Sequence, residues 1–70
     1  MTVVKVIEVI SEGKTIEEAI QRAVTEADKT LDSIVQVNVE HISGIVGKKG
    51  KIEKYRVNLK LSFVIEDKKR

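Results

Sequence analysis

The sequence contains no cysteine and no tryptophan, and it has only one histidine, one tyrosine and one phenylalanine among 70 residues. The absence of cysteine excludes disulfides, thiol chemistry and zinc sites built from cysteine ligands. Small domains without such reinforcement usually gain stability by associating with copies of themselves. We therefore expect this chain to work as one piece of a homo-oligomer.

Long apolar runs are also lacking. No uncharged apolar stretch approaches the roughly 18 residues that span a membrane. Lys5 and Glu8 interrupt the apolar N-terminal run before it reaches the roughly 7–15 residues of a signal-peptide core. We expect a cytoplasmic protein with no membrane contact, forming a single domain over residues 1–70, of which about 66–70 are a frayed charged tail.

The charges are distributed unevenly along the chain. Residues 1–46 hold four bases and eight acids, whereas residues 47–70 hold nine bases and three acids. This polarity can attract an anionic ligand, or it can bring the acidic part of one copy to the basic part of the next.

One helix is predicted in the first half of the chain, after a strand from Val3 to Ile10 that ends at a break over residues 11–13. Thr15 and Glu18 have the spacing of a capping box, so we expect the helix to begin at Ile16. Apolar residues then recur at steps that place them on one stripe of a helix about 16 residues long. The stripe consists of Ile16, Ala19, Ile20, Ala23, Val24, Ala27 and Leu31.

Two long strands are predicted in the second half. From Ile34 to Val46 apolar and polar residues alternate, and we expect the helix to cover the apolar face. That face consists of Val35, Val37 and Val39, opposite Gln36, Asn38 and Glu40. His41 continues the phase of the valines, so we place it at the margin of the core or at an interface. Gly44 is expected to form a bulge or a bend.

The last strand is predicted from Lys51 to about Ile65, with an apolar face of Tyr55, Val57, Leu59, Leu61, Phe63 and Ile65. Residues 47–50 contain two lysines between two glycines. They lack the longer glycine-rich loop and the following helix of a phosphate-binding loop, so we interpret them as a hairpin turn with a basic tip. The fold class predicted is α+β, β-α-β-β, with a three-stranded antiparallel sheet partly wrapped around one helix.

Element lengths favour self-association. A helix of 16 residues spans roughly 24 Å, whereas strands of 13–15 residues span roughly 43–50 Å. About half of the apolar face of the sheet is then left uncovered, and both sheet edges remain open.

The order of elements and several segments resemble the dodecin family. The segments are KVIEVI, EEAIQRAVTEADKTL and YRVNLKLSFVI, and the resemblance covers residues 3 to about 65. It implies a small cage protein that assembles into a homododecamer and stores or sequesters a flavin (FMN, riboflavin or FAD). In such dodecins pairs of flavin rings stack between symmetry-related tryptophans, and a glutamine holds the ring edge.

This chain differs from the family pattern at the flavin site. By the resemblance, Gln36 stands where the stacking tryptophan would be, and Arg56 stands where the glutamine would be. Stacking contributes on the order of 1–3 kcal/mol per ring, so loss of two rings predicts flavin binding weaker by about 10²–10⁴-fold. The candidate ligand-binding residues are Gln36 and Arg56, with Asn38 as a ligand or interface neighbour.

Other interpretations of these residues stay open. Arg56 has a fork of donors suited to a phosphate or carboxylate, and Gln36 can add an amide contact. The ligand can then be a flat molecule or another small anion. Alternatively, both residues belong to a polar subunit interface or to the wall of a water-filled interior.

No catalytic chemistry is predicted, because no nucleophile is paired with a base and no cofactor fingerprint is present. We expect a binding protein rather than an enzyme, without a metal site of its own. One alternative is a structural oligomer that has lost flavin and binds calcium through helix acids of several subunits; these acids are Glu17, Glu18, Glu26, Asp28 and Asp32. The other is a nucleic-acid-binding module using the basic hairpin, which the acidic helix and the low aromatic content disfavour.

Overall fold

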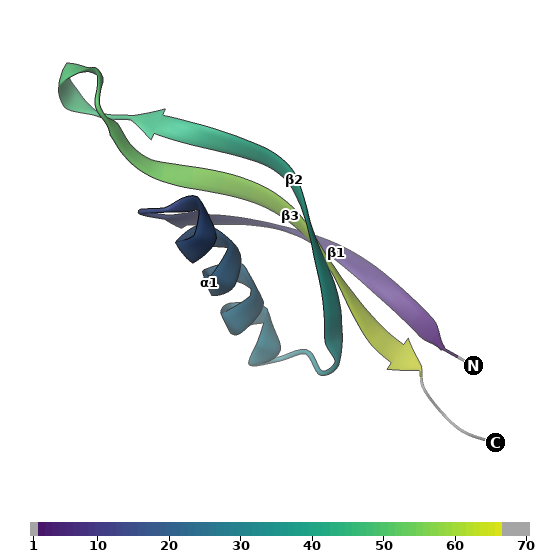
Figure 1. The fold of residues 1–70 in the computed structure, drawn as a ribbon. Helices are drawn as coiled ribbons and strands as arrows, with labels where there is room; N and C mark the ends of the chain where they lie inside the picture. Colours follow the sequence, from purple (N-terminus) through teal and green to yellow (C-terminus); the bar gives the residue numbers. More distant parts are fainter. Residues whose placement is uncertain (1, 67–70) are drawn as a thin grey trace.

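The computed structural model describes residues 2–66 as one helix lying on one face of a three-stranded sheet (Figure 1). The strands are β1 (Val3–Gly13), β2 (Ile34–Val46) and β3 (Ile52–Glu66), and the helix is α1 (Ile16–Asp28). The sheet is antiparallel with β3 in the centre, in the order β1-β3-β2. The predicted fold class is confirmed. The predicted tail falls mostly on residues 67–70, which lie outside the described residues, and residue 66 ends β3.

The start of α1 follows from its capping residues. The Thr15 side-chain oxygen accepts a hydrogen bond from the Glu18 backbone N–H at 3.0 Å. The Glu18 carboxylate in return accepts one from the Lys14 backbone N–H at 2.8 Å. The Thr15 contact is the one that a capping box predicts, whereas the Glu18 carboxylate accepts from the N–H of the residue before the cap instead of from the Thr15 N–H.

The other ends of the first two elements differ from the prediction. β1 continues to Gly13 rather than ending at Ile10, because Ser11, Glu12 and Gly13 stay paired with β3. The helix ends at Asp28, three residues earlier than expected, and the chain turns through Leu31, whose N–H donates to the Ala27 carbonyl at 2.9 Å. These ends depend on pairing and turn contacts that apolar spacing does not encode.

The core lies between α1 and the middle of β3. Ala19, Val57, Leu59 and Leu61 are completely buried, and Ala23 and Phe63 nearly so. The small alanines let the helix come close to the sheet. Half-buried side chains surround this core, namely Val9, Ile16, Ile20 and Val37.

The prediction that α1 covers the valines of β2 holds only for Val37. Val35 and Val39 are exposed, at 61% and 39%. The helix packs mainly over β1 and β3, and the pairing register of β2 shifts between Ile34 and Gln36, which takes Val35 out of the regular alternation.

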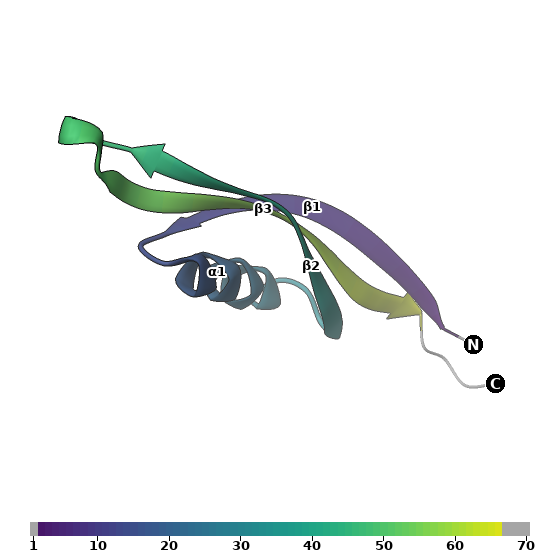
Figure 2. The same cartoon turned by 45° about the horizontal axis from the view of Figure 1, so that its top comes forward.

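The molecule is elongated, about 60 Å by 20 Å by 13 Å. α1, with 13 residues, spans only about 20 Å. The hairpin of β2 and β3 therefore projects well past the N-terminal end of the helix (Figures 1 and 2). Its tip is a short 3₁₀ turn, Lys48–Gly50, in which Gly50 has a φ of 71°.

Candidate ligand-binding face of the sheet

The sheet face opposite α1 has no helix over it (Figure 2). We call it the open face and define it by the β3 side chains Arg56, Asn58, Lys60 and Ser62 together with the residues paired with them. These β3 residues alternate with the buried Val57, Leu59 and Leu61, so they point away from the helix. The open face therefore carries the polar and charged side chains of the central strand.

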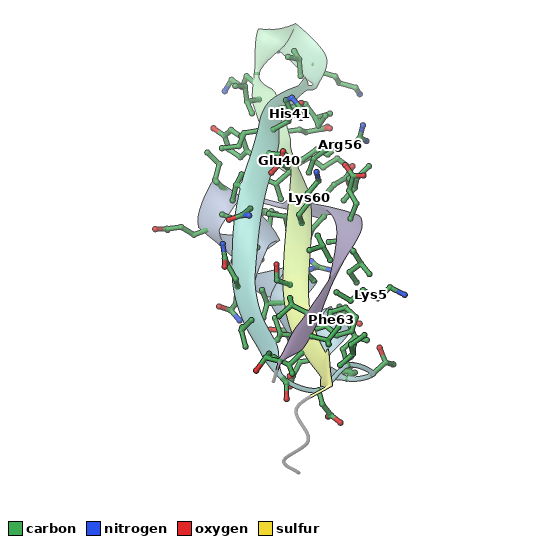
Figure 3. The ribbon with its side chains drawn as sticks, turned by 90° about the vertical axis from the view of Figure 1, so that its right-hand side faces the viewer. Lys5, Glu40, His41, Arg56, Lys60 and Phe63 are labelled. Atoms are coloured by element: carbon green, nitrogen blue, oxygen red, sulfur yellow. The ribbon has the colours of Figure 1, made fainter. Side chains whose placement is uncertain are left out.

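His41 lies on the open face, which corrects the prediction that it shares the face of Val37 and Val39 at the margin of the core. The register of β2 shifts between Val39 and His41, so Glu40 is an extra residue and His41 pairs with Asn58. A single inserted residue moves every following side chain to the other face. Figure 3 shows His41 with Arg56 and Lys60 along these strands. Gly44, expected to form a bulge or a bend, pairs regularly with Tyr55 and so forms no bulge.

Gln36 and Asn38 form one polar pair on this face. They pair with Ser62 and Lys60 of β3. The Gln36 side-chain amide nitrogen donates to the Asn38 side-chain oxygen at 3.0 Å. Both residues are exposed, so this edge of the open face offers amide donors and acceptors to a ligand or to another subunit.

Arg56 is held by Glu12, which lies opposite it on β1. The Arg56 Nε and Nη2 atoms donate to the Glu12 Oε2 atom at 2.8 Å and 2.7 Å. The Lys54 Nζ atom lies 2.8 Å from the Glu12 Oε1 atom. Hydrogen bonds from Lys54 and Arg56 lower the pKa of the Glu12 carboxyl below its usual range.

The sequence analysis missed Glu12 and Lys54, since it placed Glu12 in a break between elements. The available signal was the opposite charge of Glu12 and Arg56, which attract one another when β1 pairs with β3 in this register. That register depends on β1 continuing to Gly13, which the local sequence does not indicate.

Gln36 and Arg56 share the open face but do not meet within one chain. Gln36 pairs with Ser62, six residues along β3 from Arg56, a separation of roughly 20 Å at about 3.3 Å per residue. One chain thus presents two separate polar sites: the Gln36–Asn38 pair and the Glu12–Arg56–Lys54 cluster.

Glu12 lines two grooves. The larger, about 830 Å³, runs between β1 and α1 and is lined by Glu12, Arg56, Arg22 and mostly apolar side chains such as Val9 and Ala23. The smaller, about 400 Å³, lies near the start of α1 and is lined by charged residues: Glu12, Lys14, Glu18, Arg22, Glu53 and Lys54, with Gly13. A ligand in either groove would contact the Glu12 cluster.

The remaining candidates of the sequence analysis are dispersed over the surface. Lys48 and Lys49 are exposed at the hairpin tip, and the helix acids Glu17, Glu18, Glu26 and Asp28 are exposed too. Among residues 2–66, no three acidic or histidine side chains converge as metal ligands would. The calcium alternative would therefore need acids from several subunits.

No helix in the described range is long and apolar enough to cross a membrane.

Comparisons with known proteins agree with the architecture. The dodecin family model matches residues 3–66. A T. thermophilus dodecin with an arginine-to-alanine substitution is 32% identical, with 96% of this chain and 100% of that chain covered and a TM-score of 0.87. The Streptomyces coelicolor dodecin is 28% identical, with 96% of both chains covered and a TM-score of 0.86.

The Streptomyces davaonensis dodecin has a TM-score of 0.85 at 19% identity, with 94% of this chain and 97% of that chain covered, which supports the fold alone. A search of curated proteins found no match. The short helix on a β1-β3-β2 antiparallel sheet defines a small α+β protein with one face free of helix. The chain belongs to the dodecin family.

Proposed function

We propose that this chain is a homo-oligomeric binding protein, a dodecamer by analogy with the dodecin family, that stores or sequesters a flavin bound more weakly than in family members with a stacking tryptophan. The observation that carries the assembly is an apolar strip on the helix side of the projecting hairpin. The strip consists of Val39, Ile42, Val46 and Ile52, which are 39% to 63% exposed.

These four side chains lie on the α1 side of the sheet but beyond the reach of the helix. Val39 pairs with the buried Leu59, and Ile42 pairs with the buried Val57. The Ile52 side chain lies over Gly44, on the same side. Burial of apolar surface is favourable by about 25 cal/mol per Å², so a second copy covering the strip would stabilise an assembly.

The occupant we infer for the strip is the same chain, because the charges of its two ends are complementary. The hairpin tip bears the exposed Lys48, Lys49 and Lys51, whereas the outward side of α1 bears exposed acids. Such complementarity favours head-to-tail contacts between copies, which form a closed ring where the rotation between copies closes.

The distance between Gln36 and Arg56 limits how one ligand can contact both residues. Because these residues lie roughly 20 Å apart on one open face, a single flavin molecule that contacts both would take them from different copies. Gln36 provides amide contacts in place of an aromatic ring, and Arg56 provides charged donors in place of a neutral amide. We therefore infer a ligand site between subunits that retains polar contacts and lacks stacking.

A titration of riboflavin or FMN with the purified protein tests this function. Bound flavin is expected to lose fluorescence as protein is added, with saturation at high protein concentration. A fluorescence signal that stays constant for both flavins, with protein in large excess, would rule out flavin as the ligand.

A further inference from the structure

Lys54 and Arg56 converge on one carboxylate. They lie two residues apart on β3, on the same face of the strand, where two like charges would repel each other if no anion lay between them. Each donates to a different oxygen of Glu12, and all three contacts are between 2.7 and 2.8 Å. These are the distances of charge-assisted hydrogen bonds, which phosphate accepts as well as carboxylate does.

We propose that Lys54 and Arg56 form a subsite for a phosphate monoester and that Glu12 occupies this subsite as an internal counter-ion, so that Glu12 determines whether the protein prefers a charged or a neutral ligand. This proposal rests on the proposed flavin function for the rest of the ligand. It assigns Glu12 a role in specificity that the family resemblance does not give it.

The subsite is open to a ligand. The side chains of Glu12, Lys54 and Arg56 are 34%, 42% and 47% exposed, so an incoming anion can reach the two cations from solvent. Glu12 lines both grooves, and so does the cationic Arg22 of α1, while the acidic Glu26 lines the larger groove. Acids also lie nearby, since Glu18 and Glu53 line the smaller groove, and they limit the net positive charge there.

Glu12 competes well with a free phosphate for Lys54 and Arg56 because it is part of the same chain. An attached carboxylate is present at a high effective concentration, whereas a free phosphate must lose its translational freedom to bind. The lowered pKa of Glu12 agrees with this, because it shows that the two cations stabilise the ionised carboxylate. Glu12, Lys54 and Arg56 together carry one net positive charge. If the Glu12 carboxylate is removed, Lys54 and Arg56 carry two.

The test compares Glu12→Gln with Glu8→Gln. Both substitutions remove one negative charge from β1 on the open face, and Glu8 pairs with Lys60 without forming an ion pair within residues 2–66. The Kd of FMN and of riboflavin is measured for the wild type and both variants. We expect Glu12→Gln to increase the preference for FMN over riboflavin at least tenfold, and Glu8→Gln to change it less than twofold. An equal change in both variants, or none in either, would overturn the proposal.

A second measurement separates this proposal from the flavin function. Calorimetry with inorganic pyrophosphate should detect binding to Glu12→Gln and none to the wild type or to Glu8→Gln. If no flavin binds to any variant but pyrophosphate binds to Glu12→Gln, the flavin function fails and the anion subsite stands. If neither FMN preference nor pyrophosphate binding changes, the subsite fails.

A further variant covers the case in which Glu12→Gln does not assemble. Glu12→Asp keeps the charge but is one methylene shorter, so it reaches the two cations less well. It should shift the FMN preference in the same direction by a smaller factor. An unchanged preference in this variant would contradict the role of Glu12.

Discussion

Gly13 lies so close to Ala19 that a methyl group on its α-carbon would come within 2.8 Å of the Ala19 backbone nitrogen. Both residues are buried, and they join the end of β1 to the first turns of α1. The absence of a side chain at Gly13 therefore sets how closely the helix packs on the sheet.

Gly13→Ala should destabilise the protein by about 1–3 kcal/mol, the usual range for overpacking, because the atoms it meets belong to the backbone and cannot move aside. Urea unfolding at one fixed protein concentration measures this change, since stability of an oligomer depends on concentration. Gly44→Ala is the matched control: its methyl group would meet the flexible end of Ile52 at 3.2 Å. Equal losses for both variants would contradict the close helix packing.

Thr15→Ala should lower the free energy of unfolding by about 1 kcal/mol, because the Glu18 backbone N–H loses its acceptor at the start of α1. Thr25→Ala, at an exposed position within the same helix, should leave stability unchanged or slightly raised, since alanine favours helix. Thermal unfolding monitored by circular dichroism compares them. A loss at Thr25 as large as that at Thr15 would show that the cap has no special role.

Lys54 and Arg56 lower the pKa of Glu12 in the folded protein below its unfolded-state value, which is near 4.5. Ionised Glu12 should therefore stabilise the fold at pH values above about 4.5. The contribution should disappear as pH falls through the lowered folded-state pKa. The melting temperature of wild type should therefore exceed that of Glu12→Gln at pH 7, and the difference should shrink below about pH 4.5. A difference independent of pH from 7 to 3 would refute this role of ionised Glu12.

Gln36→Trp should strengthen flavin binding by at least about fivefold, because a stacked ring contributes on the order of 1–3 kcal/mol. Val35→Trp adds the same side chain at the neighbouring exposed position, outside the regular pairing of β2, and should change affinity little. Flavin fluorescence titration measures both. Equal gains would indicate nonspecific binding to an added aromatic ring.

Ile42→Gln should weaken assembly, because it places an amide in the apolar strip that we infer is covered by a second copy. Ser43→Gln changes the adjacent residue, which pairs with Arg56 on the open face, and should leave subunit number unchanged at the same protein concentration. Light scattering after size-exclusion chromatography gives the mass of each. Identical masses for wild type and both variants across a dilution series would contradict a role for the strip.

The sequence was sufficient to predict features that depend on near neighbours along the chain. The Thr15–Glu18 cap, the apolar stripe of α1 and the bounds of β2 follow from local spacing, and the structure confirms them. The side of the sheet on which His41 lies was not predictable in this way. It depends on one extra residue, Glu40, whose presence shows only when β2 pairs with β3.

The same limit applies to the candidate site. Gln36, Asn38 and Arg56 were chosen by resemblance and alternation, and all three lie on the open face. The partner of Arg56 was missed, because Glu12 comes 44 positions before it in the chain. The contacts between subunits that we propose are still harder to predict from local sequence, because they would join residues of two copies.

Native mass spectrometry of protein purified without added ligand tests the central claim most directly, because one spectrum reports both the subunit number and any retained ligand. Twelve chains of 7.9 kDa give a mass of about 95 kDa. The account predicts this species, and it predicts mass increments of flavin size in a second spectrum recorded after incubation with FMN. A monomer or dimer at micromolar concentration would contradict it.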